Sequence, residues 1–159
     1  MSHVNEKNQP QMVDVSGKEV TSRTAVARST VRLPPAVVEL LKDGEIQSKK
    51  GPVFATAIIA GTMAAKRTSD LIPFCHPLAI EHCDIHINLQ NSNEVVVDAT
   101  VRCHNKTGVE MEALVAASTA SLTIYDMCKA VSHDIVIAET RLMQKTGGKS
   151  GTYTKSPLQ

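Results

Sequence analysis

The stretch Ile80-Glu81-His82-Cys83-Asp84-Ile85-His86-Ile87-Asn88-Leu89, together with residues 94–103 (Glu-Val-Val-Val-Asp-Ala-Thr-Val-Arg-Cys), decides the fold. Apolar and polar residues alternate through both runs, which is the period of a β-strand with one buried face. The inward positions are Cys83, Ile85, Ile87 and Leu89 in the first run, and Val95, Val97, Ala99, Val101 and Cys103 in the second. Asn91-Ser92-Asn93 supplies turn residues between them, so we predict an antiparallel hairpin.

Helices and strands are predicted on both sides of this hairpin. A long apolar helix follows over residues 108–131, and Thr107 and Glu110 have the spacing of a capping box at its start. Residues 133–143 are predicted as the closing strand, and residues 24–33 as an early strand with one wetter face.

Two shorter helices are predicted between the early strand and the hairpin. Pro34-Pro35 opens the first, and Gly44 is its expected end. The second covers residues 53–67 and has an apolar side made of Ala55, Ile58, Ile59 and Met63. Gly61 within it predicts close packing against a neighbour.

This order of elements predicts an α+β fold, a ferredoxin-like antiparallel sheet with helices packed on one face. The 159 residues suit one domain. We assign residues 1–11 to a flexible N-terminal tail, 12–153 to a single domain and 154–159 to a C-terminal tail. Residues 12–15 (Met-Val-Asp-Val) are predicted as an edge strand or a docking segment.

The composition excludes several classes of protein. Aromatic residues are only 3% of the chain, which argues against base-stacking surfaces for single-stranded nucleic acid. The net charge of +1 gives no electrostatic footprint for nucleic acid or a membrane surface. The four cysteines lack zinc-like spacing, and we find neither a secretory leader nor an apolar run of spanning length. We therefore expect reduced thiols and a cytoplasmic location.

A thiol and an imidazole lie side by side in Leu71-Ile72-Pro73-Phe74-Cys75-His76-Pro77. The two prolines lack a backbone donor and favour extended geometry before them, so this loop is stiff and irregular. Such a loop suits binding or catalysis. The alternative is a buried turn in which Cys75 packs as a small hydrophobe and His76 bonds to a carbonyl.

The long helix carries polar residues at both ends. Asp126 and Lys129 are three positions apart and share a helix face, where a surface salt bridge is the simpler explanation. Glu112 and Asp126 lie ~40° apart around the axis but ~21 Å apart along it. One small reacting centre cannot contact both. Either the ligand is long, or the ends serve different sites, or two copies of the chain combine opposite ends.

Basic residues lie at the ends of elements or in glycine-containing loops, where they can converge on phosphate. They are Lys49, Lys50, Lys66, Arg67, Lys106, Lys129, Lys145 and Lys149. Ordinary surface lysine is the alternative, and it holds for most of them. Gly147-Gly148-Lys149-Ser150 is not a P-loop, because Met143 stands where that motif needs glycine and no helix follows.

Six motifs make the chain similar to the cyclic pyranopterin monophosphate synthase family, the molybdenum cofactor biosynthesis protein C family, from about Met12 to Tyr153. They are Lys50-Gly51, Ala64-Ala65-Lys66-Arg67-Thr68, Leu71-Ile72-Pro73-Phe74-Cys75-His76-Pro77, Lys106-Thr107-Gly108-Val109-Glu110-Met111-Glu112-Ala113-Leu114, Leu122-Thr123-Ile124-Tyr125-Asp126-Met127-Cys128-Lys129-Ala130-Val131 and Lys145-Thr146-Gly147-Gly148-Lys149-Ser150-Gly151.

The resemblance implies a lyase that converts 3′,8-cyclo-7,8-dihydroguanosine 5′-triphosphate to cyclic pyranopterin monophosphate and releases pyrophosphate. It also implies a ferredoxin-like domain in a homohexamer, a trimer of dimers with active sites at the dimer interface. Neither nucleic acid nor a membrane is an expected partner.

The resemblance also assigns residues to roles. The catalytic positions are Lys50, His76, Asp126 and Lys129; the substrate-binding segments are Phe74, Cys75 and His76 with Met111 and Glu112; the basic positions near the substrate are Arg23, Lys66, Lys145 and Lys149. Phe74 stands where the family pattern has leucine, and Arg23 lies in a loosely matching stretch. No metal ligands are assigned, although Mg²⁺ accompanying the triphosphate stays open.

Two other classes of function compete with the enzyme. One is a non-catalytic nucleotide- or pterin-binding oligomeric module that uses the same basic pocket without turnover. The other is a structural oligomer-forming domain, which predicts no stabilisation by ligand.

Overall fold

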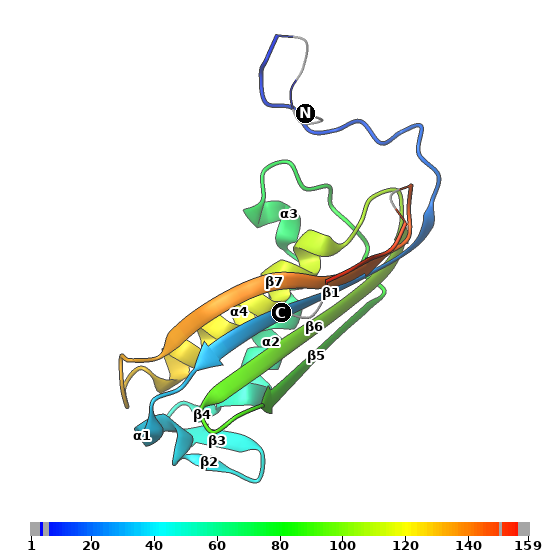
Figure 1. Cartoon of the computed structure of the whole chain (residues 1–159). Coiled ribbons are helices and arrows are strands. Elements are labelled where there is room, and N and C mark those ends of the chain that lie inside the picture. Colours follow the sequence, from blue (N-terminus) through cyan, green and yellow to red (C-terminus); the bar gives the residue numbers. More distant parts are fainter. Residues whose placement is uncertain (1–3, 5–6, 150, 156–159) are drawn as a thin grey trace.

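A five-stranded antiparallel sheet forms the body of the computed structural model, which describes residues 4, 7–149 and 151–155 (Figure 1). The strand order is β5-β6-β1-β7-β8. These strands are β1 (Thr21–Arg32), β5 (His82–Leu89), β6 (Glu94–Asn105), β7 (Val136–Thr146) and β8 (Tyr153–Thr154). The other elements are α1 (Pro35–Val38), β2 (Leu41–Lys42), β3 (Glu45–Ser48), β4 (Gly51–Pro52), α2 (Val53–Ala65), α3 (Thr68–Leu71) and α4 (Glu110–Cys128).

The predicted hairpin is confirmed, and its alternation sets which face of the sheet is buried. Strands β5 and β6 pair antiparallel with Ile85 opposite Ala99, and β1 lies between β6 and β7. The inward residues of β6 and β1 are fully or almost fully buried: Val95, Val97, Ala99, Val101 and Cys103 on β6, and Ala25, Ala27, Ser29 and Val31 on β1.

The helices cover one face of the sheet, as Figure 1 shows, and this confirms the predicted α+β fold. Helix α4 packs on β1, β6 and β7, while α2 packs on α4 and reaches β5. Small residues allow this close approach. A Cβ added to Gly61 would lie 2.6 Å from Ile85 Cδ1 and 2.8 Å from the Ala116 carbonyl oxygen, so the close packing predicted at Gly61 is confirmed.

The helix predicted from Pro34-Pro35 to Gly44 is wrong beyond its first turn. Only α1 forms, and the chain then enters the small sheet β2-β3-β4. Asp43 (φ 49°) and Gly44 (φ 79°) make the turn between β2 and β3. Two consecutive positive φ angles are the requirement of a tight hairpin turn, so Gly44 serves that turn and does not end a helix.

Helix α2 is present, but the face predicted to be buried is wrong. Ala55, Ile59 and Met63 are exposed, and the buried residues are Val53, Phe54, Ala57, Gly61 and Ala65. Almost every residue of this helix is apolar, so the sequence pattern carries little information about the inward face. Packing against α4 selects the side with the small residues.

Further differences concern the ends of elements. Helix α4 has Val109 as its N-cap with no side-chain cap, so the predicted capping box of Thr107 and Glu110 does not form. Residues 12–15 form no strand, and β7 extends to Thr146. The limits of the two tails stay a prediction, because residues 1–3, 5–6 and 156–159 lie outside the described part.

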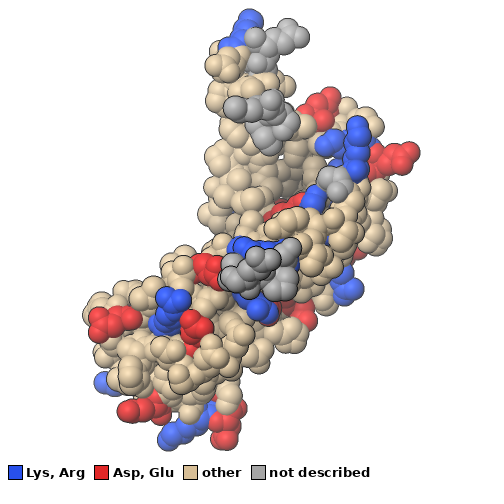
Figure 2. Space-filling view, in the orientation of Figure 1, with Lys and Arg blue, Asp and Glu red and all other residues tan. Residues whose placement is uncertain are grey.

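Charged side chains of both signs are interspersed over the face shown in Figure 2. Within the described ranges, none of the helices has the length and apolarity needed to cross a membrane.

Candidate active site

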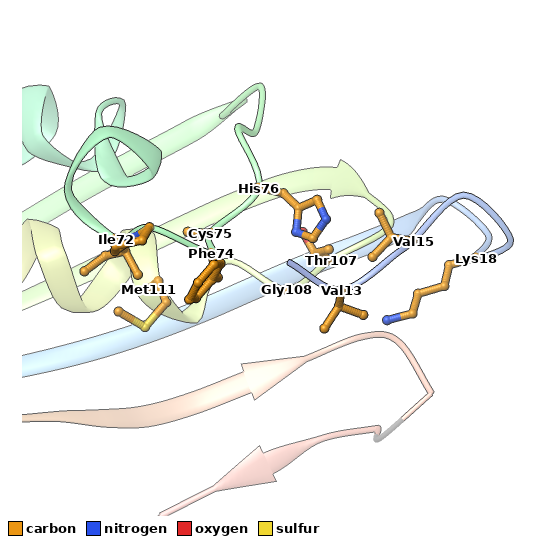
Figure 3. Close-up of a pocket in the computed structure, with 11 residues that line it drawn as sticks. Val13, Val15, Lys18, Ile72, Phe74, Cys75, His76, Thr107, Gly108 and Met111 are labelled. Carbon is orange, nitrogen blue, oxygen red and sulfur yellow. The ribbon is translucent and has the colours of Figure 1, made fainter. Parts of the chain in front are cut away.

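A cavity of about 660 Å³ lies at the N-terminal end of α4 (Figure 3). It lies between the loop after α3, the start of α4 and the N-terminal segment, and the lining residues are Val13, Val15, Lys18, Ile72, Pro73, Phe74, Cys75, His76, Thr107, Gly108 and Met111. Ile72, Phe74 and Met111 gather towards one end, with His76 and Lys18 towards the other. Four residues predicted to contact substrate thus share one cavity: Phe74, Cys75, His76 and Met111.

Cys75 links this cavity to a buried carboxyl group. Its thiol donates a hydrogen bond to Glu112 Oε1 at 3.6 Å, and its backbone amide donates to the Ile72 carbonyl at 3.0 Å. Burial raises the pKa of Cys75 to about 11, and the charge of Glu112 adds to the shift. The thiol is therefore protonated at neutral pH and acts as a hydrogen-bond donor. A reactive cysteine, in contrast, requires a lowered pKa.

Glu112 lies behind Cys75 and does not line the cavity. The residue is only 2% exposed, and its Oε2 atom is buried with no hydrogen-bond partner in the described part of the chain. Burial raises the pKa of this carboxyl group. The predicted substrate-binding residue therefore reaches the cavity through Cys75 in this structure.

A second cavity of about 520 Å³ adjoins the first and is strongly basic. Lys18, Thr107 and Gly108 line both cavities. The other lining residues of the basic cavity are Arg23, Lys106, Glu110, Lys145 and Lys149, so five cations face one carboxylate. Clustered cations of this kind suit a polyanion such as a chain of phosphates.

Contacts hold several of these cations in place. Lys145 Nζ lies 3.7 Å from Glu110 Oε1, and Lys106 Nζ donates to the Ser16 carbonyl at 2.7 Å. The second bond ties Ser16 of the N-terminal segment to a lysine of the basic cavity. Val13 and Val15 line the first cavity and residues 12–15 form no strand, so this structure favours the docking segment over the edge strand.

Lys50, Asp126 and Lys129 meet at the opposite end of α4. Lys50 Nζ lies 2.7 Å from Asp126 Oδ2, and Lys129 Nζ lies 2.7 Å from Oδ1 of the same carboxylate. Lys50 reaches this position from the turn between β3 and β4, where its backbone amide donates to Ser48 Oγ at 3.0 Å. All three side chains are about half exposed.

The ion pairs keep this group fully charged. Hydrogen bonds from Lys129 and then from Lys50 lower the pKa of Asp126 to about 2. The hydrogen bond and charge of Asp126 in turn raise the pKa of Lys129. Lysine acts as a base when its pKa is depressed, so Lys129 in this arrangement stays protonated.

One predicted residue lies apart from the others. Lys66 caps the C-terminal end of α2 and lines neither cavity, whereas Arg23 lines the basic cavity with Lys145 and Lys149. Burial raises the pKa of Cys83 and the charge of Lys66 opposes that shift, which places Lys66 beside β5. Sequence reasoning missed Lys18, whose only signal is the preceding Gly17 in a turn. In the described ranges, no three His, Cys, Asp or Glu side chains converge as a metal site.

Residues 12–148 match the MoaC family, which is most of the chain and spans both ends of α4. The chain belongs to the MoaC family. The match includes every candidate residue except Lys149, which lies one position beyond it.

Three relatives show how much of the MoaC chain is shared. The cyclic pyranopterin monophosphate synthase of Xanthomonas oryzae pv. oryzae is 52% identical over 94% of this chain and 90% of its own length. The protein of the same name from Lysinibacillus sphaericus is 52% identical over 96% of both chains. Molybdenum cofactor biosynthesis protein 1 of Dictyostelium discoideum is 52% identical over 95% of this chain, which spans 27% of that longer protein.

Proposed function

We propose that this MoaC protein is a cyclic pyranopterin monophosphate synthase, acting at an early step of molybdenum cofactor biosynthesis. It converts 3′,8-cyclo-7,8-dihydroguanosine 5′-triphosphate to cyclic pyranopterin monophosphate and releases pyrophosphate. The observation that carries the proposal is the pair of adjoining cavities, one with a thiol and an imidazole and one with five cations. Two relatives with this name, each 52% identical, support the same reaction.

The cavities suit the two halves of such a substrate. The first, at about 660 Å³, is within the range of small-molecule sites and has an apolar end at Ile72, Phe74 and Met111 for the ring system. The basic cavity beside it suits the triphosphate, where Lys106, Lys145 and Lys149 would stabilise the charge of the departing pyrophosphate.

Proton transfers are assigned to Lys50, His76, Asp126 and Lys129. We propose that Asp126 orients Lys129 and keeps it protonated, so that Lys129 delivers a proton during ring rearrangement. His76 lines the ring cavity and is the candidate acid–base group there.

The proposal requires two copies of the chain at each site, because His76 and Asp126 lie at opposite ends of α4. A two-fold axis that packs the helical layers antiparallel brings the N-terminal end of one α4 to the C-terminal end of another. Ile59, Met63 and Leu122 support such packing, since these apolar side chains on α2 and α4 are 51–61% exposed in the single chain. We propose that these dimers assemble into a homohexamer.

Turnover of the freshly prepared cyclic triphosphate tests the reaction, with pyrophosphate and pyranopterin measured together. Wild-type protein and Lys42→Ala should form both products in equal amounts, because Lys42 is exposed on β2 outside the site. Lys50→Ala should form neither. Parallel reactions with added Mg²⁺ and with a chelator establish whether the triphosphate needs a cation.

Mixing two inactive variants tests the composite site. Lys50 and His76 lie at opposite ends of α4. A dimer of one Lys50→Ala chain and one His76→Ala chain would therefore have one intact site and one doubly altered site. Random mixing should restore about a quarter of wild-type turnover. No restoration after verified subunit exchange would contradict the two-copy site.

The second candidate is a non-catalytic nucleotide- or pterin-binding oligomeric module. The exposed, mutually neutralised group of Lys50, Asp126 and Lys129 favours it, since such groups also occur as plain surface ion networks. Well-folded, oligomeric protein that binds the cyclic triphosphate without forming either product would support this candidate. For either activity we propose a cytoplasmic location, consistent with four unpaired cysteines.

A further inference from the structure

The turn after β7 is built around the side chain of Arg23. Gly147 (φ 92°) and Gly148 (φ 74°) both have left-handed backbone geometry. A Cβ atom on Gly148 would collide with Nη1 of Arg23 and lie 2.6 Å from its Cζ. The space that a side chain would fill at Gly148 is therefore occupied by the Arg23 guanidinium group.

Arg23 also binds the end of β6. Its Nε donates to the Asn105 carbonyl and its Nη2 donates to the Lys106 carbonyl, each at 3.4 Å. The guanidinium group of Arg23, at the start of β1, thus bonds the end of β6 and lies against the turn at Gly148. These segments carry Lys106, Lys145 and Lys149, which are three of the five cations of the basic cavity.

We propose that Gly148 is a positioning residue of the basic cavity, because its missing side chain lets Arg23 join the two segments that carry the phosphate-binding lysines. A methyl group at this position would displace the flexible end of Arg23 rather than the backbone. The lysines would then lose their fixed spacing, and each phosphate contact depends on that spacing. This inference rests on the proposed function, in which the basic cavity holds the phosphates of the substrate.

Gly151→Ala is the matched control for Gly148→Ala. Gly151 has a similar positive φ of 63°, so an added side chain causes similar backbone strain at both positions. Nothing lies within 4 Å of a Cβ at Gly151, so this control adds strain without a collision.

Calorimetric titration of the whole protein with pyrophosphate measures the effect without turnover. We expect Gly148→Ala to weaken pyrophosphate binding by about tenfold and Gly151→Ala by less than about twofold. In the turnover assay, Gly148→Ala should raise KM for the cyclic triphosphate and also lower kcat, because the displaced lysines bind the triphosphate and stabilise the departing pyrophosphate.

A double-mutant cycle identifies Arg23 as the partner. Once Arg23→Ala has removed the guanidinium group, adding Gly148→Ala should cost little more pyrophosphate affinity, so the two effects are not additive. The double variant also lacks the collision, which gives a folded test protein if Gly148→Ala alone does not fold.

Three results would overturn the inference: additive losses in the cycle, equal losses in Gly148→Ala and Gly151→Ala, or no pyrophosphate binding by the wild-type protein. Failure of the proposed reaction looks different. A wild-type protein that shows the non-additive pyrophosphate cycle but forms no pyranopterin would contradict the proposed function and leave the positioning role intact.

Discussion

The two ends of α4 shift the pKa values of their carboxyl groups in opposite directions. At the N-terminal end, burial raises the pKa of Glu112, which lies behind the thiol of Cys75. At the C-terminal end, two ammonium groups lower the pKa of Asp126 to about 2 in an exposed position. One helix therefore carries a carboxyl group that resists ionisation and another that resists protonation. The physical difference is that burial desolvates Glu112, whereas two positive charges lie beside Asp126.

This difference matters because the proposed chemistry needs several proton transfers and also tolerance of a highly charged substrate. The buried pair of Cys75 and Glu112 favours neutral donors, whereas the exposed ion pairs of Asp126 keep two lysines charged. A single chain keeps the two environments ~21 Å apart along α4, and assembly of two chains would combine them.

Asp126→Asn should have the largest effect, because it removes the charge that organises the exposed end. We expect kcat to fall by roughly 10²–10⁴, the usual range for loss of general acid–base catalysis. Without the carboxylate, the pKa of Lys129 should fall, since the hydrogen bond and charge of Asp126 now raise it. Any remaining activity should therefore lose its alkaline limb at lower pH than in the wild type.

The pH dependence of kcat for Asp126→Asn checks this expectation, with Asp134→Asn, an exposed carboxylate beyond α4, as the control. Full turnover with an unchanged profile in Asp126→Asn would show that the ion pairs are only a surface network.

Ile59→Lys tests whether the two ends come from different copies. The side chain is 61% exposed on α2, so the substitution should leave the isolated fold intact and weaken assembly by roughly 10²-fold, as for a central interface residue. Light scattering on a size-exclusion column measures the assembly. Val20→Lys, at a position 59% exposed away from the helical layer, should assemble normally. Unchanged assembly of Ile59→Lys would exclude this face of α2 from the interface.

Gly61→Ala tests the contact between α2 and the middle of α4. The new methyl group would meet Ile85 Cδ1 and the Ala116 carbonyl, and overpacking of this kind costs about 1–3 kcal/mol of unfolding free energy. Chemical denaturation measures the change. Gly17→Ala is the control, because nothing lies within 4 Å of a Cβ there. Equal stability of both variants would mean that α2 and α4 can separate without cost.

Glu112→Gln should have the smallest effect, and its sign depends on pH. A raised pKa means that the folded protein binds more protons than the unfolded chain, so Glu112 lowers stability as pH rises above the unfolded value near 4.5. The amide cannot ionise and should remove this penalty. We expect the variant to gain about 1 kcal/mol relative to wild type at pH 8 and nothing at pH 4.

Urea denaturation at both pH values measures this effect. A stability difference between Glu112→Gln and wild type that does not change with pH would show that the pKa of Glu112 is the same in the folded and unfolded chain.

Several features of the site could be predicted from the residues themselves. Pro73 and Pro77 indicated a stiff loop that presents Cys75 and His76, and helical spacing placed Lys129 beside Asp126. The approach of Lys50 to Asp126 could not be predicted from spacing, because 76 positions separate them and the contact depends on the small sheet β2-β3-β4. The burial of Glu112 behind Cys75 likewise follows from packing of the loop onto α4.

The sequence by itself determined the inward faces of β1, β5 and β6, because strict alternation leaves one apolar side. It also determined the close approach at Gly61, because only glycine leaves room for such contact. Only the tertiary structure decided which face of α2 is buried, because a helix apolar on all sides has no preferred orientation until a neighbour packs against it. It also decided the gathering of five cations around one cavity, since that gathering depends on contacts between segments far apart in the chain.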